Sequence, residues 1–175
     1  AKLCGRAIAH KTERGLVRLR LADADALRAA CADLLAAARP DDGAVEVLVS
    51  TMVDGNRELI AGLATDPQFG LTVMLGVGGI LAEAIRDVTF RLTPIERVDA
   101  DEMIDDLATQ RLLGEFRGEP AVDRAALAQA VEALARVGTE VPGVVSADLN
   151  PLIVVGGRPV AVDALLEVED PEVAR

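Results

Sequence analysis

The chain has 175 residues, of which 51% are hydrophobic and 27% are charged, and its formal net charge is −11. This length and apolar content predict a folded globular protein, built as one domain or as two small lobes. The negative charge argues against a nucleic-acid backbone or an anionic membrane surface as the main partner, because either would repel the chain.

Cys4 and Cys31 are the only cysteines, and they are too few and too far apart to predict a metal-ligand pattern or a disulfide framework. We expect both to be small buried residues. The sequence has no apolar run of about eighteen residues and begins without signal-peptide architecture, which predicts a cytoplasmic protein. The chain also lacks an initiator Met and opens in a predicted strand, so we expect it to be a piece of a longer polypeptide.

The first half of the chain is predicted to consist mainly of strands. Asp23 stands where the N-cap of a helix over residues 24–38 belongs. Asp54-Gly55 is typical of a hairpin turn, and Gly76–Gly79 is interpreted as a flexible break. The expected strands of this half cover residues 16–21, 45–53, 58–64 and 71–75.

The second half mixes helices and strands without strict alternation, which indicates an α+β protein. A helix is predicted to start at Asp99 or Asp101, and a longer one covers residues 123–137. The longer helix places four apolar residues on one face, namely Leu127, Val131, Leu134 and Ala135. The expected strands cover residues 82–92, 144–148, 152–155 and 160–166, and residues 170–175 are expected to form a loose tail.

The segment Asp148-Leu149-Asn150-Pro151-Leu152 carries the strongest chemical signal. Asp163 follows on what is predicted to be the next strand, after the turn at Gly156-Gly157. An amide oxygen and a carboxylate oxygen on two such strands could meet at one hard cation that carries the phosphates of a nucleotide.

Six segments together resemble one known family. They are His10-Lys11-Thr12-Glu13-Arg14-Gly15, Glu58-Leu59-Ile60-Ala61-Gly62, Asp66-Pro67-Gln68-Phe69-Gly70, Gly76-Val77-Gly78-Gly79-Ile80, Phe116-Arg117-Gly118 and Asp148-Leu149-Asn150-Pro151-Leu152. In this order they resemble the ATP-grasp domain of ADP-forming acyl-CoA synthetases of the acetate-CoA ligase type, relatives of the succinyl-CoA synthetase beta subunit. The resemblance extends over residues 1–168.

The resemblance implies an ATP-grasp fold with two α+β lobes that hold a nucleotide between them. Residues 1–53 would be the remainder of a small lobe that is incomplete at its N-terminus, residues 54–167 the large lobe, and residues 168–175 a tail. ATP or ADP with Mg2+ is the implied ligand.

The resemblance also implies roles for individual residues around the nucleotide. Lys2 would reach the phosphates and Gly15 would let the loop backbone approach them. Glu58 would accept ribose hydroxyls or hold a cation. The residues implied at the adenine edge are Thr51, Met52 and Val53. From the residues alone, Lys2 could equally be a solvated lysine, Met52 a core residue and Glu58 a solvent-facing strand residue.

His10 is the only histidine, and the resemblance implies that it assists or relays phosphoryl transfer to a histidine on another part of the enzyme. A neutral imidazole suits this chemistry because it can attack a phosphoryl group and leave again. The alternative is a polar surface histidine.

By the same resemblance, Asn150 and Asp163 would hold Mg2+. The alternative for Asn150 is a simple Asn-Pro turn, and the alternative for Asp163 is a carboxylate at the edge of a strand.

Three positions depart from the family pattern. Gly15-Leu16-Val17 stands where the family commonly has Gly-Gly-Val, and Leu16 is expected to add bulk where backbone N–H groups cradle phosphate. Leu71 replaces a frequent proline, and Ser50 replaces a frequent Gln or Glu. The change at position 16 favours an alternative, in which the domain is a non-catalytic regulatory or scaffolding module of a multidomain protein such as an acetyltransferase fusion.

The reaction implied by the resemblance converts acyl-CoA, ADP and phosphate to acid, CoA and ATP, and back, through acyl phosphate and phosphohistidine. This chain would perform only the nucleotide half. CoA-binding and phosphohistidine-bearing domains or subunits would be its partners, and an oligomer is possible. A third alternative is an ATP-grasp ligase that joins a carboxylate to an amine, but the segments at His10-Lys11 and residues 66–70 count against it.

Overall fold

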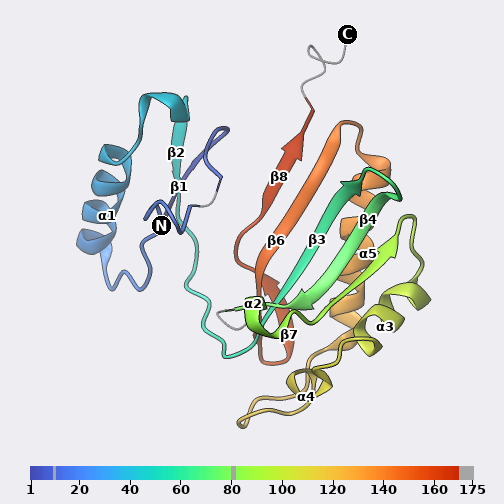
Figure 1. Cartoon of the computed structure of the whole chain (residues 1–175). Helices are drawn as coiled ribbons and strands as arrows, with labels where there is room; N and C mark the ends of the chain where they lie inside the picture. The colour runs from blue at the N-terminus through green and yellow to red at the C-terminus, as the bar shows by residue number, and fades with distance from the viewer. Residues whose placement is uncertain (10, 80–81, 170–175) are drawn as a thin grey trace. The chain divides into compact units, whose positions relative to one another are not determined.

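The computed structural model describes residues 1–9, 11–79 and 82–169, and the chain divides into two compact units, Ala1–Met52 and Val53–Arg175. Both units combine helices with antiparallel strands (Figure 1), so the predicted α+β class is confirmed. His10 and the expected tail at residues 170–175 lie outside the described residues.

The first unit packs one helix against a two-stranded sheet. Strand β1 (Lys2–Gly5) pairs antiparallel with β2 (Val45–Leu48). Helix α1 (Ala24–Ala36) begins at Asp23, whose carboxylate accepts the N–H of Ala26 at 2.8 Å, as the sequence predicted. A short 3-10 helix, η1 (Pro40–Asp42), leads into β2. The core cluster of this unit contains the buried residues Leu3, Ile8, Leu16 and Leu34.

The strand predicted over residues 16–21 is wrong. Only Val17 forms a bridge there, with Lys2, and the side chain of Leu19 is 61% exposed. Arg20 adopts a φ of +54°, a left-handed conformation that interrupts an extended strand. Of the alternating apolar residues, Leu16 is buried in the core, but the segment around it does not form a strand. Strand β2 is also shorter than predicted, because it ends at Leu48.

The second unit is built on a six-stranded antiparallel sheet. Its strand order is β5-β4-β3-β6-β7, and β8 pairs with the first half of β6 on the side where β7 pairs with the second half. The strands are β3 (Glu58–Asp66), β4 (Gly70–Val77), β5 (Val88–Leu92), β6 (Val144–Val155), β7 (Arg158–Ala161) and β8 (Leu165–Val168).

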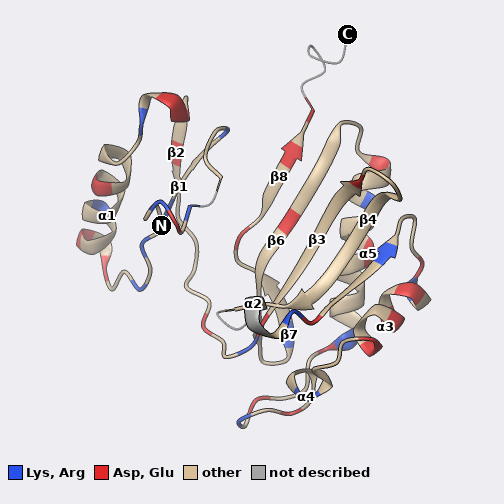
Figure 2. Ribbon diagram, in the orientation of Figure 1, with Lys and Arg blue, Asp and Glu red and all other residues tan. Residues whose placement is uncertain are grey.

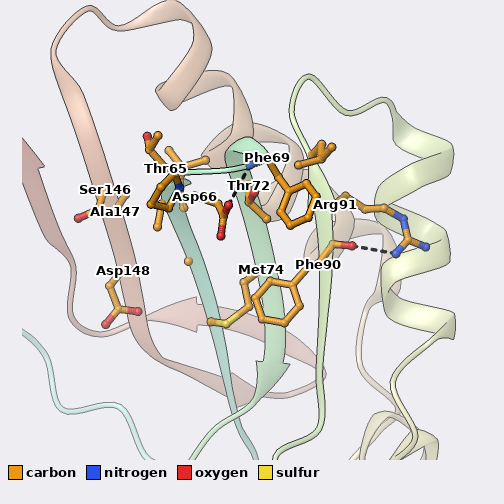
Figure 3. Close-up of a pocket in the computed structure, with 15 residues that line it drawn as sticks. Thr65, Asp66, Phe69, Thr72, Met74, Phe90, Arg91, Ser146, Ala147 and Asp148 are labelled. Atoms are coloured by element: carbon orange, nitrogen blue, oxygen red, sulfur yellow. Dashed lines mark hydrogen bonds between the residues drawn. The ribbon is translucent and has the colours of Figure 1, made fainter.

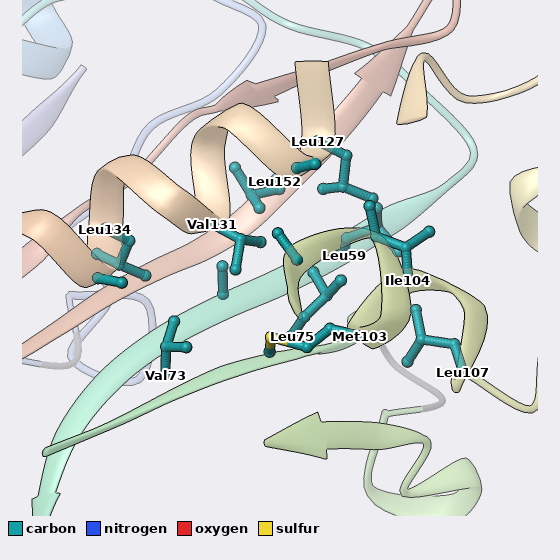
Figure 4. Close-up of a cluster of buried hydrophobic side chains, with 14 of the residues drawn as sticks. Leu59, Val73, Leu75, Met103, Ile104, Leu107, Leu127, Val131, Leu134 and Leu152 are labelled. Atoms are coloured by element: carbon teal, nitrogen blue, oxygen red, sulfur yellow. The ribbon is translucent and has the colours of Figure 1, made fainter. Parts of the chain in front are cut away.

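Helices α3 (Arg97–Asp105) and α5 (Arg124–Glu140) cover one face of this sheet (Figure 1). Figure 4 shows the leucine, valine and methionine side chains that fill the space between them and the strands. The predicted apolar face of α5 is confirmed, since Leu127, Val131, Leu134 and Ala135 are all buried. Burying each such leucine or valine contributes about 1.5–3 kcal/mol to folding. A short helix, α4 (Gln110–Leu113), precedes the loop that leads into α5.

Alternation along β3 directs its side chains to both faces of the sheet, and α3 and α5 pack against only one of them. Leu59, Ala61 and Leu63 point into the core under the helices. Glu58 and Ile60 alternate with them and therefore point to the other side, which we call the open face. Helix α5 packs very close to the sheet, because a Cβ added at Gly138 would lie 2.4 Å from a methyl group of Leu63.

Several local predictions in this unit are wrong. Residues 82–92 are not one strand: helix α2 (Ala82–Ile85) comes first, and Arg86 with φ +49° separates it from β5. Asp54-Gly55 does not form a hairpin but an extended connection beside β6, where a Cβ at Gly55 would come within 2.6 Å of the Val154 carbonyl oxygen. The glycine here allows the backbone to approach β6 closely. In the sequence, a glycine in this role resembles a turn signal.

Candidate functional site

The loop around residues 11–16 in the first unit is a closed turn. The Gly15 N–H donates to the Thr12 carbonyl at 3.0 Å, and the Leu16 N–H donates to the Lys11 carbonyl at 2.8 Å. Gly15 adopts a φ of +65°, with no atom within 4 Å of the position that a Cβ would take. Gly15 is therefore open on its Cα side, while its carbonyl accepts a hydrogen bond from Arg18 Nη1 at 2.6 Å. Lys2 lies on β1 beside the end of this loop, since it forms a bridge with Val17.

Leu16 does not add bulk to this loop, contrary to expectation. Its side chain is 1% exposed and belongs to the core cluster with Leu3, Ile8 and Leu34. Its carbonyl accepts the Leu3 N–H at 3.0 Å, which ties the loop to β1. Leu16, which stands in place of the second glycine, thus points inward and leaves the outer side of the loop free of its side chain.

The residues expected at the adenine edge lie where the two units meet in the sequence. Thr51 and Met52 end the first unit and are exposed, with Met52 at 40%. Val53 begins the second unit and is half-buried. The exposed side chain of Met52 excludes the alternative that it is a core residue of its unit.

Glu58 begins β3 on the open face, half-buried, opposite Ile153 of β6. Its carbonyl accepts the Gly78 N–H at 2.8 Å, and a Cβ at Gly79 would lie 3.4 Å from its carboxylate. The segment after β4 therefore runs closely along Glu58. A flexible break was expected at Gly76–Gly79, but its first two residues belong to β4, which continues through Gly76 to Val77. The glycines there permit close approach to β3.

Asn150 and Asp163 come from adjacent segments of the open face. The Val162 N–H donates to the Pro151 carbonyl at 3.1 Å, and Ala161 pairs with Leu152. One further step along this antiparallel arrangement places Asn150 alongside Asp163. The pairing of β3 with β6 is irregular between Leu59 and Ala61, so Asn150 lies at a bulge opposite the start of β3. Asn150 is exposed and Asp163 is half-buried.

Within residues 1–9, 11–79 and 82–169, no three His, Cys, Asp or Glu side chains gather at metal-binding distances. An amide and a carboxylate are nevertheless the donors that a hard cation accepts, and Mg2+ takes the rest of its ligands from water and phosphate. The donor set at Asn150 and Asp163 thus suits Mg2+ held together with a nucleotide. Cys4 and Cys31 are free thiols, partly buried instead of fully buried as expected.

A pocket of about 690 Å³ lies on the open face of the second unit, at the end of the β3–β4 hairpin (Figure 3). Phe69, Met74 and Phe90 approach one another there, and Asp148 of β6 lies at the margin. Phe69 is 64% exposed and Phe90 is 54% exposed. Two of the three phenylalanines in the chain therefore line one exposed pocket, which the sequence analysis did not predict.

The pattern of β5 was the signal that could have found this pocket. Thr89 and Arg91 face α3, where the Thr89 hydroxyl donates to the Met103 carbonyl at 3.1 Å and Arg91 pairs with Asp106 at 2.7 Å. The apolar residues of the strand, including Phe90 and Leu92, consequently face the open side. Figure 2 shows that β4 carries no charged residue along the same face. An apolar surface of this kind is typical of a binding site.

No helix among the described residues is long and apolar enough to cross a bilayer.

The ATP-grasp domain family matches residues 1–168. The chain is 35% identical over 166 residues to the Pyrococcus furiosus protein acetate–CoA ligase [ADP-forming] I subunit beta, covering 93% of this chain and 72% of that subunit. It spans only 22% of the length of two longer ADP-forming CoA ligases that it also matches.

Two solved structures of a Ca. Korarchaeum cryptofilum enzyme, the dinucleotide forming acetyl-coenzyme A synthetase 1, have the same fold. One, in complex with coenzyme A, Ca-AMPCP and HgCl+, aligns with a TM-score of 0.83 at 33% identity over 96% of this chain and 75% of that chain. The other, with coenzyme A and Mg-AMPPCP and its phosphohistidine segment pointing towards the nucleotide binding site, aligns with a TM-score of 0.75 at 34% identity, over 97% and 75%. The chain therefore belongs to the ATP-grasp domains of ADP-forming acyl-CoA synthetases.

Proposed function

We propose that this chain binds ADP or ATP with Mg2+ and exchanges a phosphoryl group with a histidine on a partner domain or subunit. The observation that supports the proposal is the Val162–Pro151 hydrogen bond, which lies between the pairs Leu152–Ala161 and Asp148–Leu165 and so sets the register in which Asn150 and Asp163 are neighbours. That two-oxygen donor set fits Mg2+ bound to nucleotide phosphates. A relative of the same fold, at 34% identity, was solved with Mg-AMPPCP.

The remaining contacts follow the family motif residue by residue. Lys2 and the backbone at Gly15 hold the phosphates, in line with the open Cα side of Gly15. Glu58 binds the ribose hydroxyls or the cation. The backbone of Thr51, Met52 and Val53 receives the adenine edge. His10, which lies outside the described residues, assists the transfer as a neutral imidazole that can accept and release phosphoryl.

The partner supplies CoA binding and the primary phosphohistidine. This assignment rests on relatives that are subunits of ADP-forming ligases and on a related structure whose phosphohistidine segment points towards its nucleotide binding site. The apolar pocket at Phe69, Met74 and Phe90 is suited to an incoming segment, because it lies on the same open face as Asn150 and Glu58. We further propose a cytoplasmic enzyme, consistent with the free thiols of Cys4 and Cys31, and assembly into an oligomer.

The complete reaction under this proposal interconverts acyl-CoA, ADP and phosphate with acid, CoA and ATP. This chain acts only on the nucleotide half, so its partial reaction is the sharpest test. The chain, assembled with its phosphohistidine partner, is incubated with ATP and labelled ADP, and label entering ATP is measured. Exchange that requires Mg2+ supports the proposal. A folded complete assembly that binds its partner but exchanges no label would show that the domain is not a catalyst.

A further inference from the structure

Arg14 forms a two-pronged ion pair with Asp42 in the first unit. Nη1 donates to Oδ1 at 2.7 Å and Nη2 donates to Oδ2 at 2.9 Å. The two residues are 28 positions apart in the sequence. The Asp42 side chain is only 4% exposed and that of Arg14 is 21% exposed. Such paired, parallel hydrogen bonds fix the guanidinium in one plane and one direction, which a single contact cannot do.

Asp42 is itself held rigidly. Its Oδ2 also accepts the backbone N–H of Arg39 at 2.8 Å, and its own N–H donates to the Arg39 carbonyl at 3.0 Å. These bonds close the turn at η1, immediately before β2. The carboxylate therefore belongs to the scaffold of the unit, and Arg14 binds to it from the 11–16 loop.

Arg14 lies inside the 11–16 loop, directly before Gly15. The loop is anchored at its end by the buried side chain of Leu16, as described above. Arg14 supplies a second anchor to a different part of the unit, the η1 turn. Gly15, whose backbone is exposed to the solvent, is held between these two anchors.

We infer that Arg14 is a positioning residue, whose ion pair with Asp42 fixes the phosphate loop in its binding conformation. This inference rests on the proposed function of the loop. Glycine at position 15 costs conformational entropy whenever the loop is ordered. A loop that is already ordered before the nucleotide arrives avoids paying this cost on binding. The pair contributes to the affinity for the β-phosphate without touching the nucleotide.

The test compares ADP with AMP, because AMP keeps the base, ribose and α-phosphate but lacks the β-phosphate. Affinities of both nucleotides are measured by calorimetry with Mg2+ for the wild-type chain, Arg14→Lys, Asp42→Asn and the double variant. Arg14→Lys keeps the charge but loses the fork. We expect ADP affinity to fall about tenfold in either single variant while AMP affinity changes little, and the double variant to lose no more than one single variant.

Arg28→Ala serves as the matched control, because Arg28 forms an exposed ion pair with Asp25 in the same unit. It should leave both affinities unchanged. Equal losses for ADP and AMP, in parallel with a lower Tm, would reduce Arg14 to a purely structural residue and overturn the inference. Unchanged ADP affinity in folded Arg14→Lys would also overturn it. Absence of ADP binding by the wild-type chain would instead refute the proposed function, and this inference with it.

Should Arg14→Lys fail to fold, Asp42→Asn is the second variant, since asparagine keeps the shape and one acceptor oxygen at the turn. Hydrogen exchange of the Gly15 and Leu16 amides provides a readout that is independent of nucleotide. In Asp42→Asn these amides should lose more of their protection, relative to the wild-type chain, than the amides of β1 and α1 lose. Equal exchange at Gly15 and Leu16 would contradict a positioning role.

Discussion

Val162 donates its backbone N–H to the carbonyl oxygen of Pro151 at 3.1 Å, and this bond aligns the segment after β7 with the middle of β6. The two residues that flank the bond on the outer side are Asn150 and Asp163. The backbone pairing brings an amide and a carboxylate residue to neighbouring positions, which is what the proposed Mg2+ site requires. Both positions are set by the sheet, whose other face is packed against α3 and α5.

Arg57→Ala is expected to destabilise the second unit by about 3 kcal/mol or more. Arg57 is 3% exposed and donates to the carbonyls of Leu112, Gly114 and Pro120 and to the carboxylate of Glu119. Removing it takes the buried donor from four part-buried acceptors, of which, among the described residues, only Glu119 keeps another side-chain donor, Asn56. Urea unfolding followed by circular dichroism measures the effect. Arg117→Ala, at an exposed arginine stacked on Phe116, is the control and should cost at most about 1 kcal/mol.

The stability of the first unit should depend on pH in acid through Asp42. Hydrogen bonds from Arg14 and from the Arg39 backbone lower the pKa of this carboxyl from 3.8 to about 2. A depressed pKa in the folded state stabilises the fold fully above pH 3.8, and that contribution is lost as the pH falls towards 2. Thermal unfolding of wild-type and Asp42→Asn should therefore differ most near neutral pH and converge towards pH 2. A difference between them that stays constant over this range would contradict the assignment.

Phe90→Ser should separate stability from activity. The Phe90 side chain is 54% exposed on the open face, so its loss should change the free energy of unfolding by only about 0.5 kcal/mol in the isolated chain. Phosphoryl exchange with the partner should nevertheless fall, because the pocket loses its apolar wall. Leu75→Ala, which removes a fully buried side chain from the other face, should instead cost about 2–5 kcal/mol. Wild-type exchange rates in Phe90→Ser would exclude this pocket from partner binding.

The parts of the fold that could be predicted from sequence are those governed by local signals. Asp23 and Asp123 both accept a backbone N–H at the start of a helix, at 2.8 and 2.9 Å, as side chains of this type do at N-caps. The apolar face of α5 follows from helical periodicity. The register that makes Asn150 and Asp163 neighbours was suggested by the turn at Gly156-Gly157 between two predicted strands and by the family resemblance.

The remaining features depend on tertiary packing. Alternation in β5 shows that Val88, Phe90 and Leu92 share a face but not that the helices cover the other one. Leu16 is apolar in a loop motif, and only the position of β1 beside it turns the side chain inward. The partner of Arg14 lies 28 residues away, beyond the reach of any local rule. Arg57 was missed for the same reason, since its acceptors lie 55 to 63 residues further along the chain.

Calorimetric titration with ADP tests directly whether Asn150 and Asp163 hold Mg2+ for a nucleotide. ADP is titrated with and without Mg2+ into the wild-type chain, the double variant Asn150→Ala/Asp163→Ala, and Asp25→Ala as an exposed control on α1. We predict Mg2+-dependent binding in the wild-type chain and in the control, and its loss in the double variant. Mg2+-dependent binding of equal affinity in the folded double variant would contradict the account.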